Sequence, residues 1–165
     1  MSYFIVIHGS LGSGKSTIAK ELASKLDAVR VQIDDILSEY KLDTHDDFEA
    51  SIPAANFIKA LHFVLPDVKA KLDSGHVVIF DGCFYHKEVM DYLLENIRAP
   101  HYLFTLKAPL AVCIERDKNR HKSLGEDAAK AVYELTSQLD FGEIVDTTRP
   151  LEESIAKILS YLPVK

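Results

Sequence analysis

The sequence predicts an α/β fold in which a parallel sheet is covered by helices on both faces. Short apolar segments typical of strands alternate with longer segments whose apolar residues recur at helical spacing. The apolar run at residues 76–80 is continuous, as in strands that are buried on both faces of a parallel sheet. No repeat, low-complexity tract or linker divides the 165 residues, so a single domain over residues 1–165 is expected.

The first three elements are a strand, a helix and a strand. Residues 4–7 form a short apolar strand. Residues 15–26 have helical spacing, because one face carries Ile18, Leu22 and Leu26. Residues 29–33 alternate like a strand and end in two aspartates.

A long helix and the buried strand come next. The helix is expected over residues 53–72, bent or interrupted before Pro66, because proline removes a helical hydrogen bond. Ser74–Gly75 ends the helix, and the strand at 76–80 follows. Residues 87–96 are again helical.

The last third of the chain completes the alternation. Residues 102–106 are predicted as the fourth strand and 143–147 as a short fifth strand. Between them, helices are expected over 109–120 and 126–139, separated by the polar stretch HKSLGE. Residues 151–162 form the closing helix.

Composition limits the class of protein. Hydrophobic residues make up 47% of the chain, which predicts a packed core. The net charge of -6 argues against a broad nucleic-acid surface, so nucleic acid is not the expected partner. Cys83 and Cys113 lie far apart in apolar surroundings and are expected to be buried thiols. No targeting or membrane-spanning segment is recognisable, and a cytoplasmic location without membrane contact is expected.

The stretch from Gly9 to Ser16 fits the pattern G-x-x-x-x-G-K-[ST]. Its glycines allow a tight turn close to phosphate oxygens, and the following helix directs its N-terminal N–H groups at the anion. The lysine reaches the β- and γ-phosphates, and the serine hydroxyl can ligate Mg²⁺. A chance match in a glycine-rich turn is the alternative, but the strand before and the helix after favour a phosphate site. We therefore predict binding of a nucleoside triphosphate, ATP or GTP, by Gly9, Gly12, Ser13, Gly14, Lys15, Ser16 and Thr17.

Several P-loop classes lack support in the sequence. The chain has neither the DxxG turn nor the [NT]KxD motif of GTPase switches, and no LSGGQ-like stretch of ABC ATPases. A ring-forming ATPase usually adds a second helical domain, for which 165 residues leave no room. A small kinase-like core remains.

Two aspartates follow the second strand. The carboxyl ends of parallel strands border the ligand crevice, so Asp34 is expected opposite the γ-phosphate, where it could accept a proton from an acceptor hydroxyl. Asp35 is a second candidate for contact with the substrate. The alternative is that one or both carboxylates cap the helix that DDILSEY begins.

Asp81 closes the buried third strand. This is the usual place for an acidic residue that holds Mg²⁺ through water or contacts the acceptor, and Gly82 allows a close approach. The alternative is an ordinary strand-to-turn Asp-Gly pair.

Arg116 and Arg120 are four residues apart on a predicted helix, so their guanidinium groups should share one face. Near the nucleotide they would stabilise charge on the transferring phosphoryl group, as part of a lid over roughly residues 109–127. With Glu115 and Asp117 beside them, a solvated face with ion pairs is the alternative.

In their order, GSLGSGKST, DD, VVIFDG, RDKNR and VDTT resemble the small P-loop kinases over nearly the whole chain. This group includes polynucleotide kinase, chloramphenicol phosphotransferase, adenylylsulfate kinase, zeta toxins and the shikimate and gluconate kinases. The resemblance implies a P-loop NTPase fold of three α/β/α layers, a five-stranded parallel sheet, a short helical lid and Mg²⁺-ATP as phosphoryl donor.

The resemblance also implies roles for individual residues. Lys15 and Ser16 would hold phosphate and metal, Asp34 would match the catalytic aspartate, and Arg116 and Arg120 the lid arginines. Thr147, in the loop after the last strand, would pass by the adenine; an ordinary strand-to-helix turn is the alternative.

The acceptor segment departs from the nucleotide kinases of this group. Where they carry an arginine after the Asp-Gly pair, this chain has His86 and Lys87. Residues 34–57 hold one lysine, Lys41, against seven carboxylates: Asp34, Asp35, Glu39, Asp43, Asp46, Asp47 and Glu49. A phosphate acceptor needs cationic partners, so the prediction is an ATP-dependent kinase for a small, uncharged or cationic alcohol. A nucleotide or nucleic-acid 5′-hydroxyl kinase and a non-catalytic ATP-binding module are the alternatives.

Overall fold

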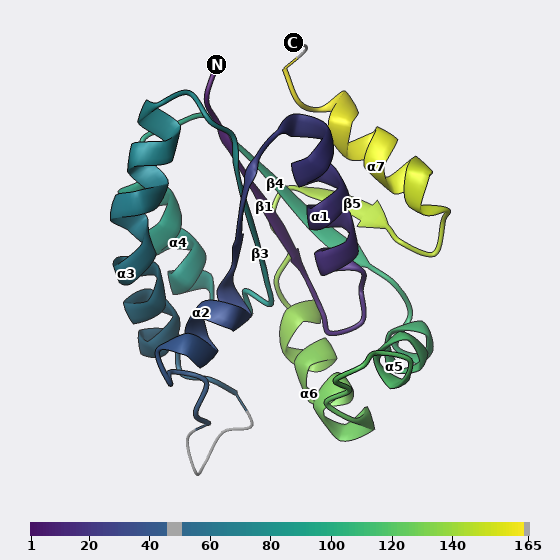
Figure 1. Cartoon of the computed structure of the whole chain (residues 1–165). Coiled ribbons are helices and arrows are strands. Elements are labelled where there is room, and N and C mark those ends of the chain that lie inside the picture. Colours follow the sequence, from purple (N-terminus) through teal and green to yellow (C-terminus); the bar gives the residue numbers. More distant parts are fainter. Residues whose placement is uncertain (46–50, 164–165) are drawn as a thin grey trace.

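The computed structural model describes residues 1–45 and 51–163. These residues form one parallel sheet of five strands in the order β2-β3-β1-β4-β5, which confirms the predicted α/β P-loop NTPase fold (Figure 1). The strands are β1 (Phe4–Gly9), β2 (Val29–Gln32), β3 (Val78–Gly82), β4 (His101–Lys107) and β5 (Glu143–Asp146). The helices are α1 (Lys15–Leu26), α2 (Ile33–Glu39), α3 (Ala54–Asp73), α4 (Lys87–Asn96), α5 (Leu110–Lys118), α6 (Glu126–Ser137) and α7 (Leu151–Ser160).

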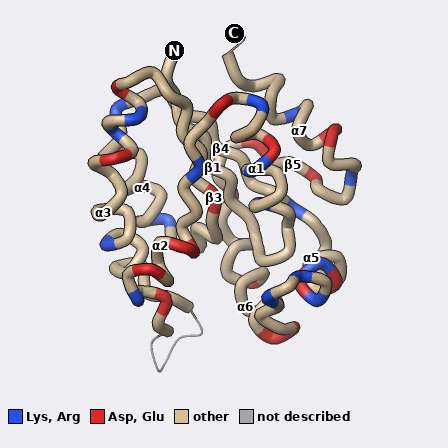
Figure 2. Tube along the Cα trace, viewed as in Figure 1, with Lys and Arg blue, Asp and Glu red and all other residues tan. Residues whose placement is uncertain are grey.

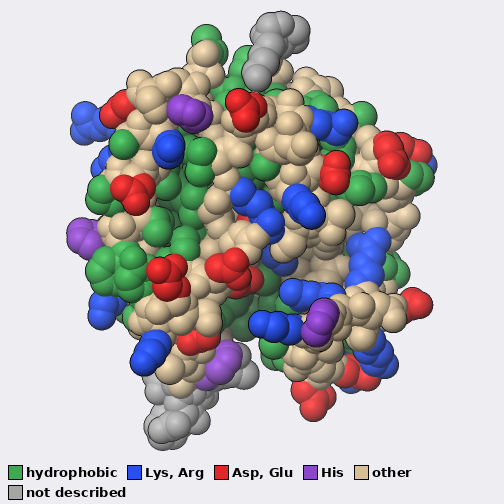
Figure 3. All heavy atoms as spheres, in the orientation of Figure 1, with side chains coloured by type: hydrophobic (Ala, Val, Ile, Leu, Met, Phe, Trp, Pro, Cys, Tyr) green, Lys and Arg blue, Asp and Glu red, His purple; other side chains and the backbone are tan. Residues whose placement is uncertain are grey.

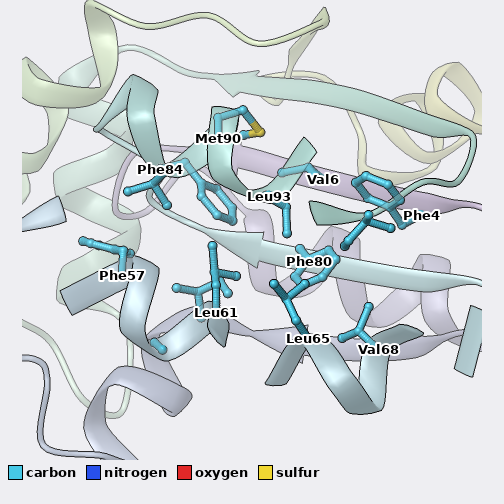
Figure 4. Packing of buried hydrophobic residues seen from close by; sticks show 14 of the residues in the cluster. Phe4, Val6, Phe57, Leu61, Leu65, Val68, Phe80, Phe84, Met90 and Leu93 are labelled. Carbon is cyan, nitrogen blue, oxygen red and sulfur yellow. The ribbon is translucent and has the colours of Figure 1, made fainter. Parts of the chain in front are cut away.

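The central strand β1 divides the core between the two faces of the sheet. Phe4 and Val6 pack with α2, α3 and α4, whereas Ile5 and Ile7 pack with α1 and α7. Figure 4 shows Phe80 of β3 among the α3 and α4 side chains on the first face. Since successive side chains of a strand point to opposite faces, a strand that is apolar throughout forms both halves of such a core.

The chain departs from the predicted elements at Pro66. The helix α3 runs without interruption from Ala54 to Asp73, with the proline inside it. Pro66 and His62, whose carbonyl loses its helical partner, are both exposed, so water can hydrate the freed carbonyl. The buried residues Leu61, Leu65 and Val68 hold the two halves of the helix against the sheet.

Two other boundaries differ from the prediction. The helix α2 starts at Ile33, inside the strand predicted over residues 29–33. The helix expected over 109–120 ends at Lys118, so Arg120 lies beyond it. Asp46, Asp47 and Glu49 of the acidic segment lie outside the described residues.

The described helices include none that is both long enough and apolar enough to cross a membrane. The carboxyl ends of the strands lie at the end of the molecule opposite the two termini, surrounded by α2, α5 and α6 (Figure 1). The candidate site is at this end.

Candidate active site

The loop between β1 and α1 is held open by its glycines. Gly12 and Gly14 have φ angles of 74° and 96°, in the left-handed region that favours glycine. Gly14 is the N-cap of α1, and no side chain caps the helix there. The first-turn N–H groups of α1 are therefore available to an anion, as the motif predicts.

The carbonyl oxygen of Ser10 organises the loop. It accepts hydrogen bonds from the N–H of Ser13 (3.2 Å), the hydroxyl of Ser13 (2.7 Å) and the Nζ of Lys15 (2.6 Å). Ser13 is fully buried, so its side chain maintains the loop. The Lys15 ammonium lies across the loop, where phosphate oxygens would be its natural alternative partners.

Ser16 and Asp81 lie together, as the sequence predicts for residues that hold metal. The hydroxyl of Ser16 donates to Oδ2 of Asp81 over 3.4 Å. The guanidinium of Arg30 donates to both carboxylate oxygens, from Nε to Oδ1 (3.0 Å) and from Nη2 to Oδ2 (2.9 Å). Arg30 was not predicted as a site residue, although a charged side chain between two valines of a short strand is a signal for it.

The donor atoms around Ser16 fit Mg²⁺. Mg²⁺ prefers oxygen ligands and is usually held by one or two protein oxygens together with phosphates and water. The Ser16 hydroxyl and the Asp81 carboxylate supply oxygens of this kind. The described residues contain no group of three or more His, Cys, Asp or Glu side chains that could hold a metal.

Asp34 and Asp35 occupy the first turn of α2, whose N-cap is Gln32. Neither aspartate is the N-cap, so the predicted alternative of a capping role is wrong. The carboxylate of Asp35 accepts a hydrogen bond from the Gln32 amide. Asp34 is exposed to solvent and lies within electrostatic reach of the P-loop lysine.

The pKa of Asp34 lies above its ordinary value. The largest cause is desolvation by the surrounding protein; the nearby carboxylates of Asp81 and Asp35 also raise it, whereas Lys15 and Arg120 lower it. The side chain is reachable by water but incompletely hydrated. The structure thus brings Asp34 within the electrostatic reach of the lysine, the aspartate and the arginine with which it was predicted to act.

Arg116 links three parts of the site through Thr147. Its guanidinium donates to Oγ1 (3.2 Å) and to the carbonyl oxygen (2.6 Å) of Thr147. The Thr147 hydroxyl in turn donates to the carbonyl of Ser13 in the P-loop (2.8 Å). The loop after β5 therefore ties α5 to the phosphate-binding loop, and contact of Thr147 with adenine stays a prediction.

Arg120 and the connection between α5 and α6 are organised by a buried carboxylate. Asp117, with 1% of its surface exposed, accepts from Arg120 (3.4 Å), the Ser123 hydroxyl (2.7 Å) and the N–H groups of Leu124 and Gly125 (3.1 and 3.2 Å). The alternative of a solvated face with ion pairs fails for Asp117 in one respect, because its side chain is buried, although it does form an ion pair with Arg120. Arg116 and Arg120 line the same cavity although Arg120 is not on the helix, and their role in a lid stays a prediction.

We expect Asp117→Asn to loosen the connection between α5 and α6. Four groups donate to the two oxygens of the carboxylate, whereas an amide has a single oxygen that can accept. The variant should lose about 1–3 kcal/mol of unfolding free energy and bind ATP more weakly, since Arg120 loses its anchor. Urea unfolding and nucleotide titration measure both effects. Glu115→Gln, an exposed neighbour on α5, is the matched control and should change neither.

A cavity of about 360 Å³ extends from the P-loop toward α7. Its lining includes Gly12, Gly14, Lys15, Ser16, Thr17, Arg116, Arg120 and Thr147, together with Arg149 and Ser154. Most of the residues predicted to bind the nucleotide thus surround one space. Gly9 lies at the end of β1 behind the loop, where an added Cβ would approach the carbonyl of Leu106 to 2.8 Å.

Charge is divided across the site. Basic residues lie on and just after α5, together with acidic ones, whereas α2 carries Asp34, Asp35 and Glu39 (Figure 2). Figure 3 shows Lys and Arg side chains clustered at the centre of this face, with Asp and Glu side chains beside them. One side of the site suits phosphates, and the other side repels them.

His8, immediately before the loop, is fully buried and bonded through both ring nitrogens. Nδ1 accepts from the N–H of Phe84 (3.1 Å), and Nε2 lies 3.1 Å from the carbonyl of Leu139. These partners require the neutral Nε2–H tautomer. Burial, and next the charge of Lys15, lower the pKa of His8 to about 4, while Asp140 opposes the shift.

His8 should make stability depend on pH. Its folded pKa of about 4 is below its ordinary value of 6.5, so between these values the unfolded chain binds a proton that the folded chain does not. Its contribution is complete above pH 6.5 and is lost as the pH falls toward 4, by roughly 3 kcal/mol in total. Urea unfolding at several pH values should show a smaller loss in His8→Gln than in the parent. The same substitution at exposed His76 should leave the parent's pH dependence unchanged.

The comparisons agree with this geometry. A sequence-family model described as an AAA domain matches residues 4–139. The structure of a sugar kinase from Janibacter sp. HTCC2649 is similar with a TM-score of 0.76 and 21% identity, over 98% of this chain and 94% of that one. A gluconokinase from Sinorhizobium meliloti 1021 is similar with a TM-score of 0.65 and 18% identity, over 94% of this chain and 89% of that one.

At these identities the two structures support the fold. The P-loop, in a domain of this kind, implies nucleotide binding. The family match covers most of the chain, and the chain therefore belongs to the AAA domain family.

Proposed function

We propose that this protein is an ATP-dependent phosphotransferase that moves the γ-phosphoryl group of ATP to a hydroxyl of a small, uncharged or cationic acceptor. The observation that carries the proposal is the position of Asp34. This exposed carboxylate lies close enough to Lys15 and Arg120 for both positive charges to lower its pKa, against the larger effect of desolvation. A protein that only binds ATP needs no carboxylate opposite the phosphate-binding lysine. The fold shared with the sugar kinase and the gluconokinase supports the same reaction class.

The residues divide the reaction between them. Asp34 accepts the proton of the acceptor hydroxyl as its oxygen forms a bond to the γ-phosphorus, and the bond from that phosphorus to the β,γ-bridging oxygen breaks to release ADP. The raised pKa of Asp34 makes it a stronger base than an ordinary aspartate. Lys15, Arg116 and Arg120 stabilise negative charge on the phosphates during transfer. Mg²⁺, when bound near Ser16 and Asp81, would neutralise further phosphate charge.

The charge of the acceptor side supports an uncharged or cationic acceptor. Asp34, Asp35, Glu39 and Asp43 are exposed on or after α2, and Lys41 is their basic neighbour in the sequence. An anionic acceptor would be repelled by these carboxylates, because Lys41 is the one lysine or arginine that the segment 34–57 itself supplies. The sugar kinase is named for uncharged acceptors, whereas the name gluconokinase implies a carboxylate-bearing one, so the charge of the acceptor needs its own test.

A thermal-shift screen in the presence of an ATP analogue tests this proposal. We expect polyols, sugars or amino alcohols to raise the melting temperature beyond the value reached with the analogue. Further stabilisation by nucleoside monophosphates or 5′-hydroxyl oligonucleotides alone would contradict the proposed acceptor class. Tight ATP binding without ADP formation in the presence of any stabilising alcohol would indicate a binding module instead.

A further inference from the structure

The edge strand β2 carries an arginine that reaches the buried carboxylate at the end of β3. In the sheet register, Arg30 pairs with Ile79 and Gln32 pairs with Asp81. Val29 and Val31 pack into the core on the α3 and α4 face, so Arg30 points to the opposite face, the face of Asp81 and α1. The arginine therefore extends along the sheet toward the P-loop.

Arg30 and Asp81 form a bidentate ion pair. Nε and Nη2 of Arg30 each bond one oxygen of Asp81, at 3.0 and 2.9 Å, which fixes the plane of the carboxylate. The side chain of Asp81 is 4% exposed and that of Arg30 is 20% exposed, so the pair is shielded from water. An ion pair of this kind keeps its geometry better than an exposed pair.

The carboxylate of Asp81 also contacts Ser16, the residue after the P-loop lysine. Oδ2 of Asp81, which accepts from Arg30, also lies 3.4 Å from the hydroxyl of Ser16. A continuous chain of contacts thus runs from Arg30 in β2 through Asp81 to Ser16. Residues that hydrogen-bond a metal-ligating carboxylate fix its orientation, and their mutation typically costs about 10–100-fold in metal affinity or activity.

We propose that Arg30 is a positioning residue, which acts through Asp81 to orient the oxygens at the metal-facing end of the nucleotide site. This inference rests on the proposed function only in so far as it requires Mg²⁺-dependent binding of ATP. Arg30 itself touches neither phosphate nor acceptor in this role. Its effect is on the free energy with which Mg²⁺ strengthens nucleotide binding.

The experiment measures the dissociation constant of a non-hydrolysable ATP analogue by calorimetry, with Mg²⁺ and with EDTA. The ratio of the EDTA value to the Mg²⁺ value reports the metal-dependent part of binding. In Arg30→Lys, which keeps the charge but loses the two-pronged contact, this ratio should fall by about tenfold or more. Arg98→Lys, the same change at an exposed site, should leave the ratio at the parent's value.

Two further variants separate positioning from a structural role. In an Asp81→Asn background, Arg30→Lys should cause no further fall of the ratio, because Arg30 acts through Asp81. If Arg30→Met unfolds because it leaves Asp81 buried and unpaired, the lysine variant still decides the matter. A lower melting temperature with an unchanged ratio in Arg30→Lys would overturn the proposal. A higher ratio would also overturn it, since Arg30 would then compete with the metal.

The two proposals fail in different ways. If the parent protein binds no ATP analogue under either condition, the proposed function is wrong. If the parent binds the analogue more tightly with Mg²⁺ and Arg30→Lys keeps that advantage, the proposed function stands and the positioning role of Arg30 is wrong.

Discussion

Replacing Asp34 with asparagine is expected to lower kcat for phosphoryl transfer by about 10²–10⁴-fold, the usual contribution of a general base. Asparagine keeps the size of the side chain but cannot take the proton of the acceptor hydroxyl. Binding of an ATP analogue should change little, because the phosphate-binding loop is formed by the backbone around Ser10 and by Lys15. Steady-state kinetics and an analogue titration measure the two effects.

Stability should move in the other direction. The pKa of Asp34 is raised in the folded protein, so above that pKa its ionised form disfavours folding relative to the unfolded chain. Asparagine removes this cost at neutral pH, and the melting temperature should stay the same or rise slightly. A residue that lowers stability while it supports activity is typical of a functional site.

The neighbouring aspartate provides the matched control. Asp35→Asn makes the same chemical change one residue along, at a side chain bonded to Gln32. We expect kcat to remain within a few-fold of the parent in this variant, with the acid limb of the pH profile at lower pH, because the Asp35 charge raises the pKa of Asp34. A kcat near the parent value in Asp34→Asn, or an equal loss in both variants, would contradict the role of Asp34 as the base.

Replacing Gly12 with alanine is expected to damage both stability and nucleotide binding. Gly12 has a φ of +74°, and an added Cβ would lie 2.2 Å from the carbonyl oxygen of Cys113 in α5. Because that atom belongs to the backbone of a helix, α5 has to move, and Arg116 moves with it. The strained backbone and the overpacking should cost about 2–5 kcal/mol of unfolding free energy. Binding of the ATP analogue should weaken about tenfold or more, which corresponds to the loss of one charge-assisted contact from Arg116.

Gly75→Ala separates the two causes. Gly75 has a similar φ of +89°, but an added Cβ there meets nothing within 4 Å. Its loss of unfolding free energy should be only the backbone cost of about 1–2 kcal/mol, without any effect on nucleotide binding. Equal losses in the two variants by urea unfolding would show that contact between Gly12 and α5 is unimportant.

The sequence predicts the fold well because the signals are local. Apolar strands and amphipathic helices are recognisable in short windows, and the P-loop pattern fixes both a strand end and a helix start. The two buried free thiols, Cys83 and Cys113, are also confirmed. The local sequence around Pro66 does not predict that α3 continues past the proline. The continuity depends on the packing of α3 against the sheet and on the exposure of the carbonyl that loses its hydrogen bond.

The site is predictable only in part, because several contacts depend on sheet order and on loop geometry. Arg30 meets Asp81 because β2 lies beside β3, and no local pattern specifies this neighbour. Asp117 looks solvated on a helical wheel, yet the chain folds back so that Ser123, Leu124 and Gly125 donate to it. The acidic segment after the second strand is easier to recognise than these contacts, because its charge can be counted in the sequence without knowing which residues lie next to it.

Transfer to an uncharged or cationic alcohol is tested most directly with ATP labelled at its γ-phosphate and a set of acceptors that differ in charge. The set pairs a polyol and an amino alcohol with the corresponding hydroxy acid and phosphorylated alcohol, and it includes a nucleoside monophosphate. We expect label on the polyol or the amino alcohol with the parent protein, and a loss of this label in Asp34→Asn. Label only on the hydroxy acid, the phosphorylated alcohol or the nucleotide, or release only as inorganic phosphate, would contradict the proposed function.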